Sequence, residues 1–328
     1  MKRSMKSSKG FTIVEMLTVM GIIVILISLL LPALGQVRDY SRVIQQKAQF
    51  HGIEVGLSLF ESDMGYLPPS FDNINAKTGD NAIRSCEGST TEDANHYTGA
   101  NKLAEAMVGM DQLGFHPNSG FWGDGENCVK LDTGNKQLTE VYSADADTGN
   151  WQTKEENLDA RKGPYLDTEN ANAYRMDEVY DSLINFNGEE MVLCDIYSKT
   201  RSASGFKTGM PVLYFKARTQ YSSQDYQEDE NTLDTIDIDM EDDDIYYALD
   251  NYAVIEEGVP GTNGDDHPYI TDSTVNYGFD KFEDLILNNK VSTIQRPYRA
   301  NSYILWSAGK DGLYGTADDL TNFDAEAE

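Results

Sequence analysis

The sequence is poor in basic residues, and it lacks the short motifs of the common enzyme classes. Its 328 residues include 26 Lys and Arg against 55 Asp and Glu, a formal net charge of −29. A folded domain this negative repels phosphate backbones, which argues against nucleic-acid binding and makes cations the more natural ligands. No GxSxG, HExxH, GxGxxG or Walker A motif is present. We therefore predict that the chain is not an enzyme.

The chain has few cysteines, and they do not form a metal-binding pattern. Cys86, Cys128 and Cys194 show no CxxC spacing and have no histidine at metal-ligand intervals, which argues against a zinc site. In an extracytoplasmic domain any two of them can form a disulfide, or all three can remain thiols. We favour Cys86 with Cys128, because both lie in Gly/Asn/Ser-rich stretches. Cys194 lies in the apolar run MVLCDIY, which is typical of a buried strand.

Only one long hydrophobic run is present, at the amino terminus. Residues 11–34 carry a single charged residue, Glu15, and the run exceeds the roughly 20 residues that a membrane-spanning helix needs. Residues 1–10 are basic and polar. By the positive-inside rule, the amino terminus lies in the cytoplasm and the rest of the chain lies across the membrane.

The junction in front of this run carries the most specific motif in the chain. The string KGFTIVEML at residues 9–17 resembles the prepilin signature of type IV pilins and of type II secretion pseudopilins. The resemblance implies that residues 1–10 are a leader peptide and that a prepilin peptidase cleaves after Gly10. The new amino terminus, Phe11, would then be methylated, and the apolar helix would remain on the mature protein.

Two residues within the apolar run also match family positions. A carboxylate in an apolar helix is costly unless it is paired or lies near the membrane surface. An interfacial location of Glu15 is one interpretation. The resemblance implies instead that Glu15 pairs with the free amino terminus of a neighbouring subunit and sets register during assembly. It also implies that Pro32 kinks the helix.

The helix is predicted to continue beyond the membrane as an amphipathic segment over residues 35–62. One apolar face is expected to pack on a globular domain, with members at spacings of three to five: Val37, Tyr40, Ile44, Ala48, Ile53, Leu57 and Phe60. The segment DMGYLPP at residues 63–69 should end the helix. It resembles the D-x-G-x-Y/L-P stop of major pseudopilins.

Residues 63–328 are predicted to form a periplasmic globular domain. We expect short helices at residues 101–110 and 173–183. Strands are expected at residues 189–198, 210–216 and 302–306, from their β-branched and aromatic content. The fold class is therefore α+β and pilin-like, with one long helix packed on a small antiparallel sheet. Residues of about 70–200 and 217–295 would be large, loop-rich insertions.

Two acidic segments are candidates for cation binding. Residues 225–244 contain a dense run of carboxylates without EF-hand form, so a solvated loop is the default and calcium capture the alternative. Residues 305–323 begin LWSAGKDGLYGTADDL and resemble the calcium loop of major type II pseudopilins. An Asp/Gly turn without metal is the alternative there.

The resemblance also implies a ligand set for this loop. The carboxylate ligands of calcium would be Asp311 and Asp318, and Asp319 can replace Asp318. Backbone carbonyls near Ala308, Gly309 and Leu320 would complete the coordination.

Taken together, the resemblance implies a structural subunit of a periplasmic pseudopilus that drives type II protein export. Its partners would be further copies of itself, the prepilin peptidase, other assembly proteins and the inner membrane, which it would cross once. The alternatives are a type IV pilus subunit for adhesion or motility, in an extracellular filament, and a membrane-anchored binding protein or hydrolase with a pilin-type leader.

Overall fold

The computed structural model describes most of the chain in separate stretches. These are residues 12–71, 96–121, 126–130, 136–142, 154–167, 171–183, 185–186, 188–200, 207–220, 244–259, 282, 285–288, 290 and 294–323. The predicted leader, the Gly10–Phe11 junction and Cys86 lie outside them, as does the acidic stretch 225–244 up to Asp243.

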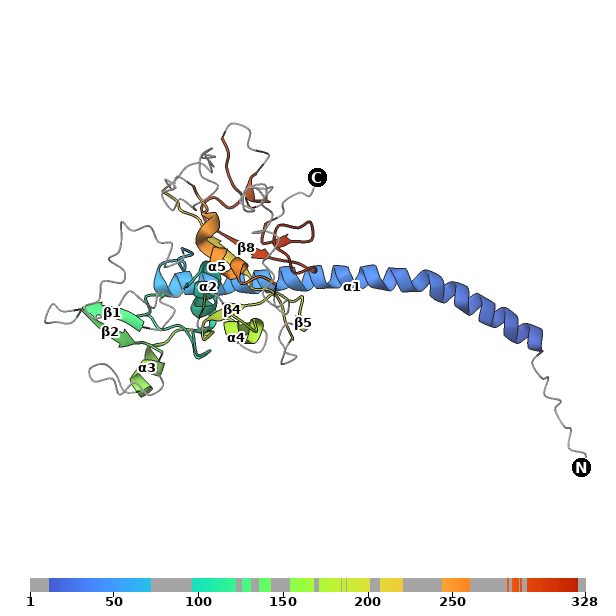
Figure 1. The fold of residues 1–328 in the computed structure, drawn as a ribbon, viewed down its shortest axis with the longest axis horizontal. Helices are drawn as coiled ribbons and strands as arrows, with labels where there is room; N and C mark the ends of the chain where they lie inside the picture. Colours follow the sequence, from blue (N-terminus) through green and yellow to red (C-terminus); the bar gives the residue numbers. More distant parts are fainter. Residues whose placement is uncertain are drawn as a thin grey trace, which may run out of the picture. The chain divides into compact units, whose positions relative to one another are not determined.

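Two compact units make up the chain, Met1–Gln45 and Gln46–Glu328. Helix α1 (Ile13–Met64) begins in the first unit and ends in the second (Figure 1). At its start, Thr12 and Glu15 form a reciprocal cap. The Thr12 N–H donates to Glu15 Oε2 at 2.9 Å, and the Glu15 N–H donates to Thr12 Oγ1 at 3.3 Å. At its end, Gly65 has a φ of +81°, which favours glycine and stops the helix inside the predicted segment.

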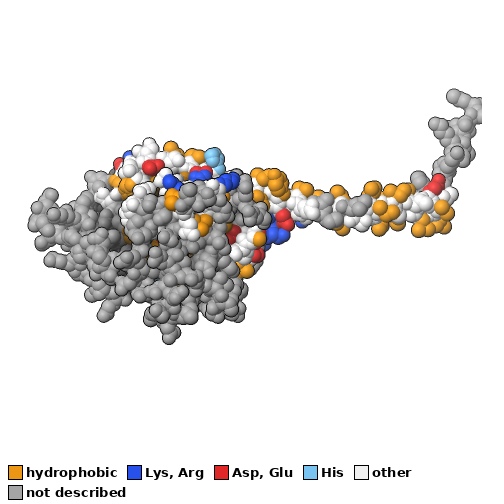
Figure 2. All heavy atoms as spheres, turned by 90° about the horizontal axis from the view of Figure 1, so that it is seen from above, with side chains coloured by type: hydrophobic (Ala, Val, Ile, Leu, Met, Phe, Trp, Pro, Cys, Tyr) orange, Lys and Arg blue, Asp and Glu red, His pale blue; other side chains and the backbone are white. Residues whose placement is uncertain are grey.

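The first unit leaves its apolar side chains exposed along α1. Figure 2 shows them in orange, and they include Ile13 and Leu17, which are 81% and 68% exposed. Among the described stretches, no helix combines the length and the apolar content that a membrane crossing requires.

The prediction of one continuous apolar face on residues 35–62 was wrong. Val37, Tyr40, Ile44 and Ala48 are exposed, whereas Ile53, Leu57 and Phe60 are buried together with Phe50. The step of five residues from Ala48 to Ile53 turns by about 140° around a helix of 3.6 residues per turn. The predicted set therefore joined two different faces of α1.

The second unit is an α+β structure with small antiparallel sheets. Its three-stranded sheet is formed by β7 (Leu213–Lys216), β8 (Tyr303–Ser307) and β9 (Leu320–Thr321), in the order β7-β8-β9. Two-stranded sheets pair β1 (Glu126–Lys130) with β2 (Lys136–Glu140), β3 (Ala173–Arg175) with β4 (Met191–Leu193), and β5 (Lys199–Thr200) with β6 (Lys207–Thr208). The short helices are α2 (Gly99–Val108), α3 (Lys154–Ala160), α4 (Met176–Val179), the 3-10 helix η2 (Ala248–Asn251) and α5 (Tyr252–Glu256).

The predicted strands are present as β4, β7 and β8, and the predicted helix at 101–110 is α2. The prediction of a helix at residues 173–183 was wrong for its first three residues. There Ala173–Arg175 is strand β3, which pairs with β4 through Tyr174↔Val192, and the helix that follows has only four residues. Pairing with β4 overrides the local helical pattern.

The two faces of the three-stranded sheet bury different cores. On one face, Tyr214 and Leu305 pack in a cluster with the buried residues of α1 and with Met107 of α2. On the other face, Phe215 and Trp306 pack in a cluster with residues of α5. This alternation follows from the period of two along a strand. The acidic carboxy-terminal sequence follows the end of β8 and forms the loop that leads to β9.

Candidate functional site

The candidate site is the loop of residues 308–319 between β8 and β9. The two strands pair through Trp306↔Thr321 and Ser307↔Leu320, so the loop closes a hairpin. Two buried rings fix it to the core. The Trp306 indole N–H donates to Asp319 Oδ2 at 2.7 Å, and the Tyr314 hydroxyl donates to the Pro211 carbonyl. The two rings also contact edge to face, with centroids 5.6 Å apart.

Asp319 organises the inside of the loop. Besides the indole, its Oδ2 accepts the backbone N–H groups of Gly315 and Thr316 at 2.7 and 3.2 Å. Burial raises the pKa of Asp319 to about 7, although these donors oppose the rise. The Thr316 hydroxyl donates to Asp319 Oδ1 at 3.3 Å, so this carboxylate accepts four donors from the protein and serves as a structural centre of the turn.

Asp311 and Asp318 form a carboxyl pair. Asp318 Oδ2 accepts the N–H groups of Lys310 and Asp311 at 2.6 and 2.9 Å, and Asp318 Oδ1 accepts the Thr316 hydroxyl at 2.7 Å. Asp311 Oδ1 accepts the Leu313 N–H at 2.8 Å. Burial raises the pKa of Asp311, and the charge of Asp318 adds to the rise. Burial opposes ionisation of Asp318 as well, but its hydrogen bonds leave its pKa lowered.

Gly309 allows the two ends of the loop to approach. Its φ is +64°, and a Cβ at this position would lie 2.2 Å from the Asp318 carbonyl oxygen and 2.8 Å from Asp318 Oδ2. A side chain here would displace Asp318 from the N–H groups that it accepts. The glycine is therefore needed for the position of the carboxyl pair.

The loop combines two carboxylates, those of Asp311 and Asp318. Within the described part of the chain, no group of three or more His, Cys, Asp or Glu side chains is arranged to hold a metal ion. Calcium does not require three, because backbone carbonyls and water can supply the rest of its six to eight oxygen ligands. The pair Asp311 and Asp318 concentrates negative charge at one point, which a divalent cation would neutralise.

The sequence-predicted ligands are thus brought to one loop, and their contacts differ. Asp318 accepts the N–H of Asp311, whereas Asp319 accepts the indole N–H of Trp306. Leu320 pairs with Ser307 in the β8–β9 ladder. Whether the carbonyls of Ala308, Gly309 and Leu320 bind a cation stays a prediction.

The end of the hairpin is tied to α1 by polar contacts that the sequence pattern does not show. Glu54 Oε1 accepts the Asn322 amide at 3.0 Å and forms an ion pair with Arg299 at 2.8 Å. Asn322 Oδ1 in turn accepts the Leu305 N–H at 3.0 Å. The strand that follows the loop is therefore held on the helix by a shared carboxylate.

The other predicted residues lie apart from this loop. Glu15 and Pro32 belong to α1 in the first unit, and the Pro32 side chain lies outside the described residues. Cys194 is buried directly after β4, as predicted. The favoured pairing of Cys86 with Cys128 is untested, because Cys86 and the Cys128 side chain lie outside the described residues.

Comparison of the chain with protein-family models, with curated proteins and with solved structures gave no match.

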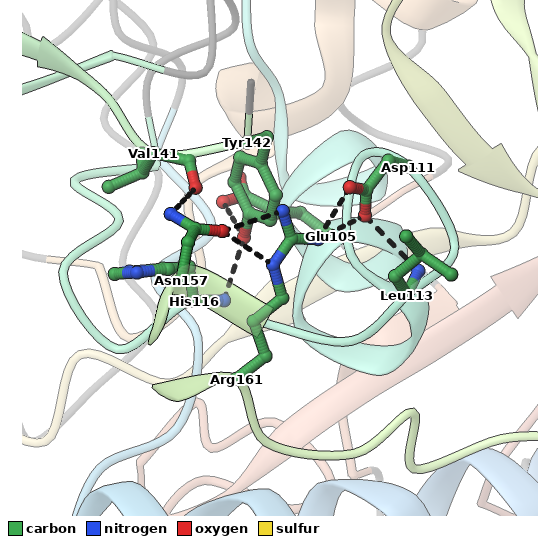
Figure 3. A network of polar contacts seen from close by, with 8 residues as sticks. All are labelled: Glu105, Asp111, Leu113, His116, Val141, Tyr142, Asn157 and Arg161. Atoms are coloured by element: carbon green, nitrogen blue, oxygen red, sulfur yellow. Dashed lines mark hydrogen bonds and ion pairs between the residues drawn. The ribbon is translucent and has the colours of Figure 1, made fainter. Parts of the chain in front are cut away.

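A second polar cluster, which sequence patterns did not indicate, is centred on Glu105 of α2 (Figure 3). The carboxylate is fully buried and accepts the hydroxyls of Tyr97 at 2.7 Å, Tyr142 at 2.8 Å and Ser119. Burial raises the pKa of Glu105, although the three hydroxyls and the nearby Lys102 oppose the rise. Side chains from two described stretches, residues 96–121 and 136–142, thus converge on one carboxylate.

An ion pair extends this cluster. Arg161 pairs with Asp111 and donates to Asn157 Oδ1 at 3.0 and 3.1 Å. Asn157 donates to the Val141 carbonyl at 3.1 Å. The cluster therefore holds the stretch of residues 96–121 to Tyr142 and, through Asp111, to Arg161 at the end of α3.

The raised pKa of Glu105 gives a testable pH dependence. A carboxyl whose folded-state pKa lies above its unfolded value of about 4.5 favours folding at low pH, and this contribution is lost as the pH rises through the folded-state pKa. Glu105→Gln removes the titration. The stability of the variant relative to the wild type should therefore improve between pH 4.5 and pH 8, as measured by urea unfolding. Glu189→Gln, at a carboxylate whose side chain is 78% exposed, is the control and should show little change. Parallel pH profiles for Glu105→Gln and the wild type would contradict the assignment.

Proposed function

We propose that this chain is a membrane-anchored, pilin-like filament subunit, cleaved after Gly10, and that the filament is the periplasmic pseudopilus of a type II secretion system. The observation that carries the proposal is the position of the signature at residues 9–17. It stands at the start of a 52-residue helix whose first part exposes apolar side chains and whose last part packs on an α+β domain. One helix thus joins a segment that needs apolar surroundings to a folded unit.

The exposed apolar side chains support assembly. Isolated exposed leucines need no explanation, but a continuous apolar helix surface indicates contact with lipid or with protein. In the proposed subunit, residues 11–34 lie in the inner membrane before assembly and pack against neighbouring copies in the filament. In the second unit, Val55 and Leu59 leave a smaller apolar strip on α1, 47% and 51% exposed. This strip offers a further surface for a neighbouring subunit.

The contacts of Glu15 suit an exchange of partners. Its carboxylate accepts the N–H and the hydroxyl of Thr12, both at 2.9 Å. After cleavage, the amino group of Phe11 on a neighbouring subunit would offer a positively charged donor, so both partners of the bond would be ionised, whereas the donors of Thr12 are neutral. Glu15 would then leave its own helix cap and pair between subunits.

We propose calcium as the ion of the carboxy-terminal loop. Asp311 and Asp318 would hold it, and the carbonyls of Ala308, Gly309 and Leu320 are the proposed further ligands. When bound, the cation would supply charge neutralisation and cross-linking of the loop. Asp319 holds Trp306 and the turn, so it is the less suitable ligand of the two neighbouring aspartates.

The test of the filament proposal is assembly of a Glu15→Val variant. In membranes from cells that coexpress a prepilin peptidase, chemical crosslinking should yield a ladder of oligomers from the wild type. Glu15→Val should stay inserted in the membrane, because the change makes the helix more apolar, but its ladder should be strongly reduced. Glu61→Val, at an exposed glutamate on the same helix, is the matched control and should retain the ladder.

The maturation step is checked in the same cells. Mass spectrometry should find a mature amino terminus at methylated Phe11, and Gly10→Val should block cleavage and assembly together. A mature chain that begins beyond Leu34 would indicate an ordinary secreted protein. Equal ladders from the wild type and Glu15→Val would refute the pairing of Glu15.

A further inference from the structure

A lysine from a different part of the chain contacts the candidate loop. Lys199 belongs to β5, which pairs with β6 through Lys199↔Thr208. Its Nζ donates to the backbone carbonyl oxygen of Asp311 at 2.8 Å, across 112 residues of sequence. The positive charge of Lys199 therefore lies at the main chain of Asp311, whose carboxyl forms the acidic pair with Asp318.

The charge of this lysine and the charge of the loop are complementary. Asp318 Oδ2 accepts the Asp311 N–H at 2.9 Å, and Asp319 follows directly in the sequence. An ammonium on the main chain of this acidic loop offsets part of the repulsion between the carboxyls of the loop without a metal. It also fixes the Asp311 carbonyl, so it holds the loop in place from the outside, while Trp306 holds it from the core through Asp319.

We infer that Lys199 is a built-in counter-charge that sets the calcium affinity of the carboxy-terminal loop: it stabilises the loop when the metal is absent and opposes the metal when it binds. The inference rests on the calcium site proposed above and adds its regulation. A single positive charge near a divalent cation repels it, and the same charge is part of what keeps the empty loop folded. Calcium would therefore bind only above a concentration that Lys199 helps to set.

The expected size of the effect follows from Coulomb's law. In a water-like dielectric, the repulsion between a charge of +1 and a charge of +2 within one loop changes the affinity by up to about tenfold. Lys199 is exposed, so salt screens part of this repulsion, and the effect should shrink as the ionic strength rises.

The experiment uses the full-length chain in detergent micelles and the variant Lys199→Met, which keeps an unbranched side chain without the charge. Isothermal titration with calcium chloride at low salt should give a Kd about three- to tenfold lower than that of the wild type, and the difference should narrow in 0.5 M KCl. In chelator, the variant should melt at a lower temperature than the wild type. Lys199→Arg, which keeps the charge, should resemble the wild type in both measurements.

Lys207→Met is the matched control, because this exposed lysine lies on the paired strand and the change in net charge is the same. An equal change of Kd in Lys207→Met and Lys199→Met would overturn the inference, because net charge alone would then explain it. An unchanged Kd in Lys199→Met would also overturn it. If the wild type binds no calcium, the calcium site itself fails. The melting temperatures in chelator then still decide whether Lys199 stabilises the loop.

Discussion

Gly99→Ala should destabilise the second unit by about 2–4 kcal/mol, a large effect for a single methyl group. A Cβ at Gly99 would lie 2.2 Å from the Tyr214 carbonyl oxygen and 3.1 Å from both polar atoms of the Asn251 side chain. Asn251 accepts the Ala100 N–H and donates to that carbonyl, both at 2.7 Å. The methyl group would separate the start of α2 from β7 and leave buried polar groups without partners.

The control for this prediction is another glycine of the same unit. Gly52 lies within α1, and a Cβ there would meet only Leu166 Cδ2, at 3.9 Å. Gly52→Ala should be neutral or stabilising by about 0.5–1 kcal/mol, because alanine is the better helix former. Urea unfolding of the full-length chain in micelles measures both changes through the midpoint at constant slope. Similar stability of the two variants would show that the contact between α2 and β7 is not as close as described.

Calcium should raise the melting temperature of the wild type by roughly 5–10 °C over its value in chelator. A ligand that binds only the folded state at 100 times its Kd stabilises by about 2.7 kcal/mol, and about 1 kcal/mol corresponds to roughly 2–4 °C for a domain of this size. Magnesium should substitute poorly, because it demands stricter octahedral geometry. Asp311→Ala and Asp318→Ala should each abolish the difference between calcium and chelator.

Two further variants separate a specific site from general screening of an acidic chain. Alanine substitutions across residues 241–244 should keep most of the calcium effect, because these carboxylates belong to a different segment. Asp319→Ala should lower the melting temperature with and without calcium, because the Trp306 indole and two backbone N–H groups lose their acceptor. Loss of the calcium effect in the 241–244 variant together with its persistence in Asp311→Ala would move the site to the other acidic segment.

The parts of the fold that depend on neighbouring residues could be predicted from the sequence. The stop of α1 at Gly65 follows from local backbone preference, since glycine accepts the positive φ found there. The strands β7 and β8 were indicated by runs of aromatic and β-branched residues. The acidic and glycine-rich spacing also identified the carboxy-terminal loop as one unit of structure.

The sequence by itself determined the long amino-terminal helix, its stop and the β-strands at residues 213–216 and 303–307, because period and propensity act over a few residues. Only the tertiary structure decided which side of α1 is buried, that Ala173–Arg175 is a strand, and that Asp319 turns to Trp306. It alone brought Lys199 to Asp311. These outcomes depend on the burial of apolar surface and the pairing of desolvated polar groups from distant segments, and no local pattern encodes such contacts.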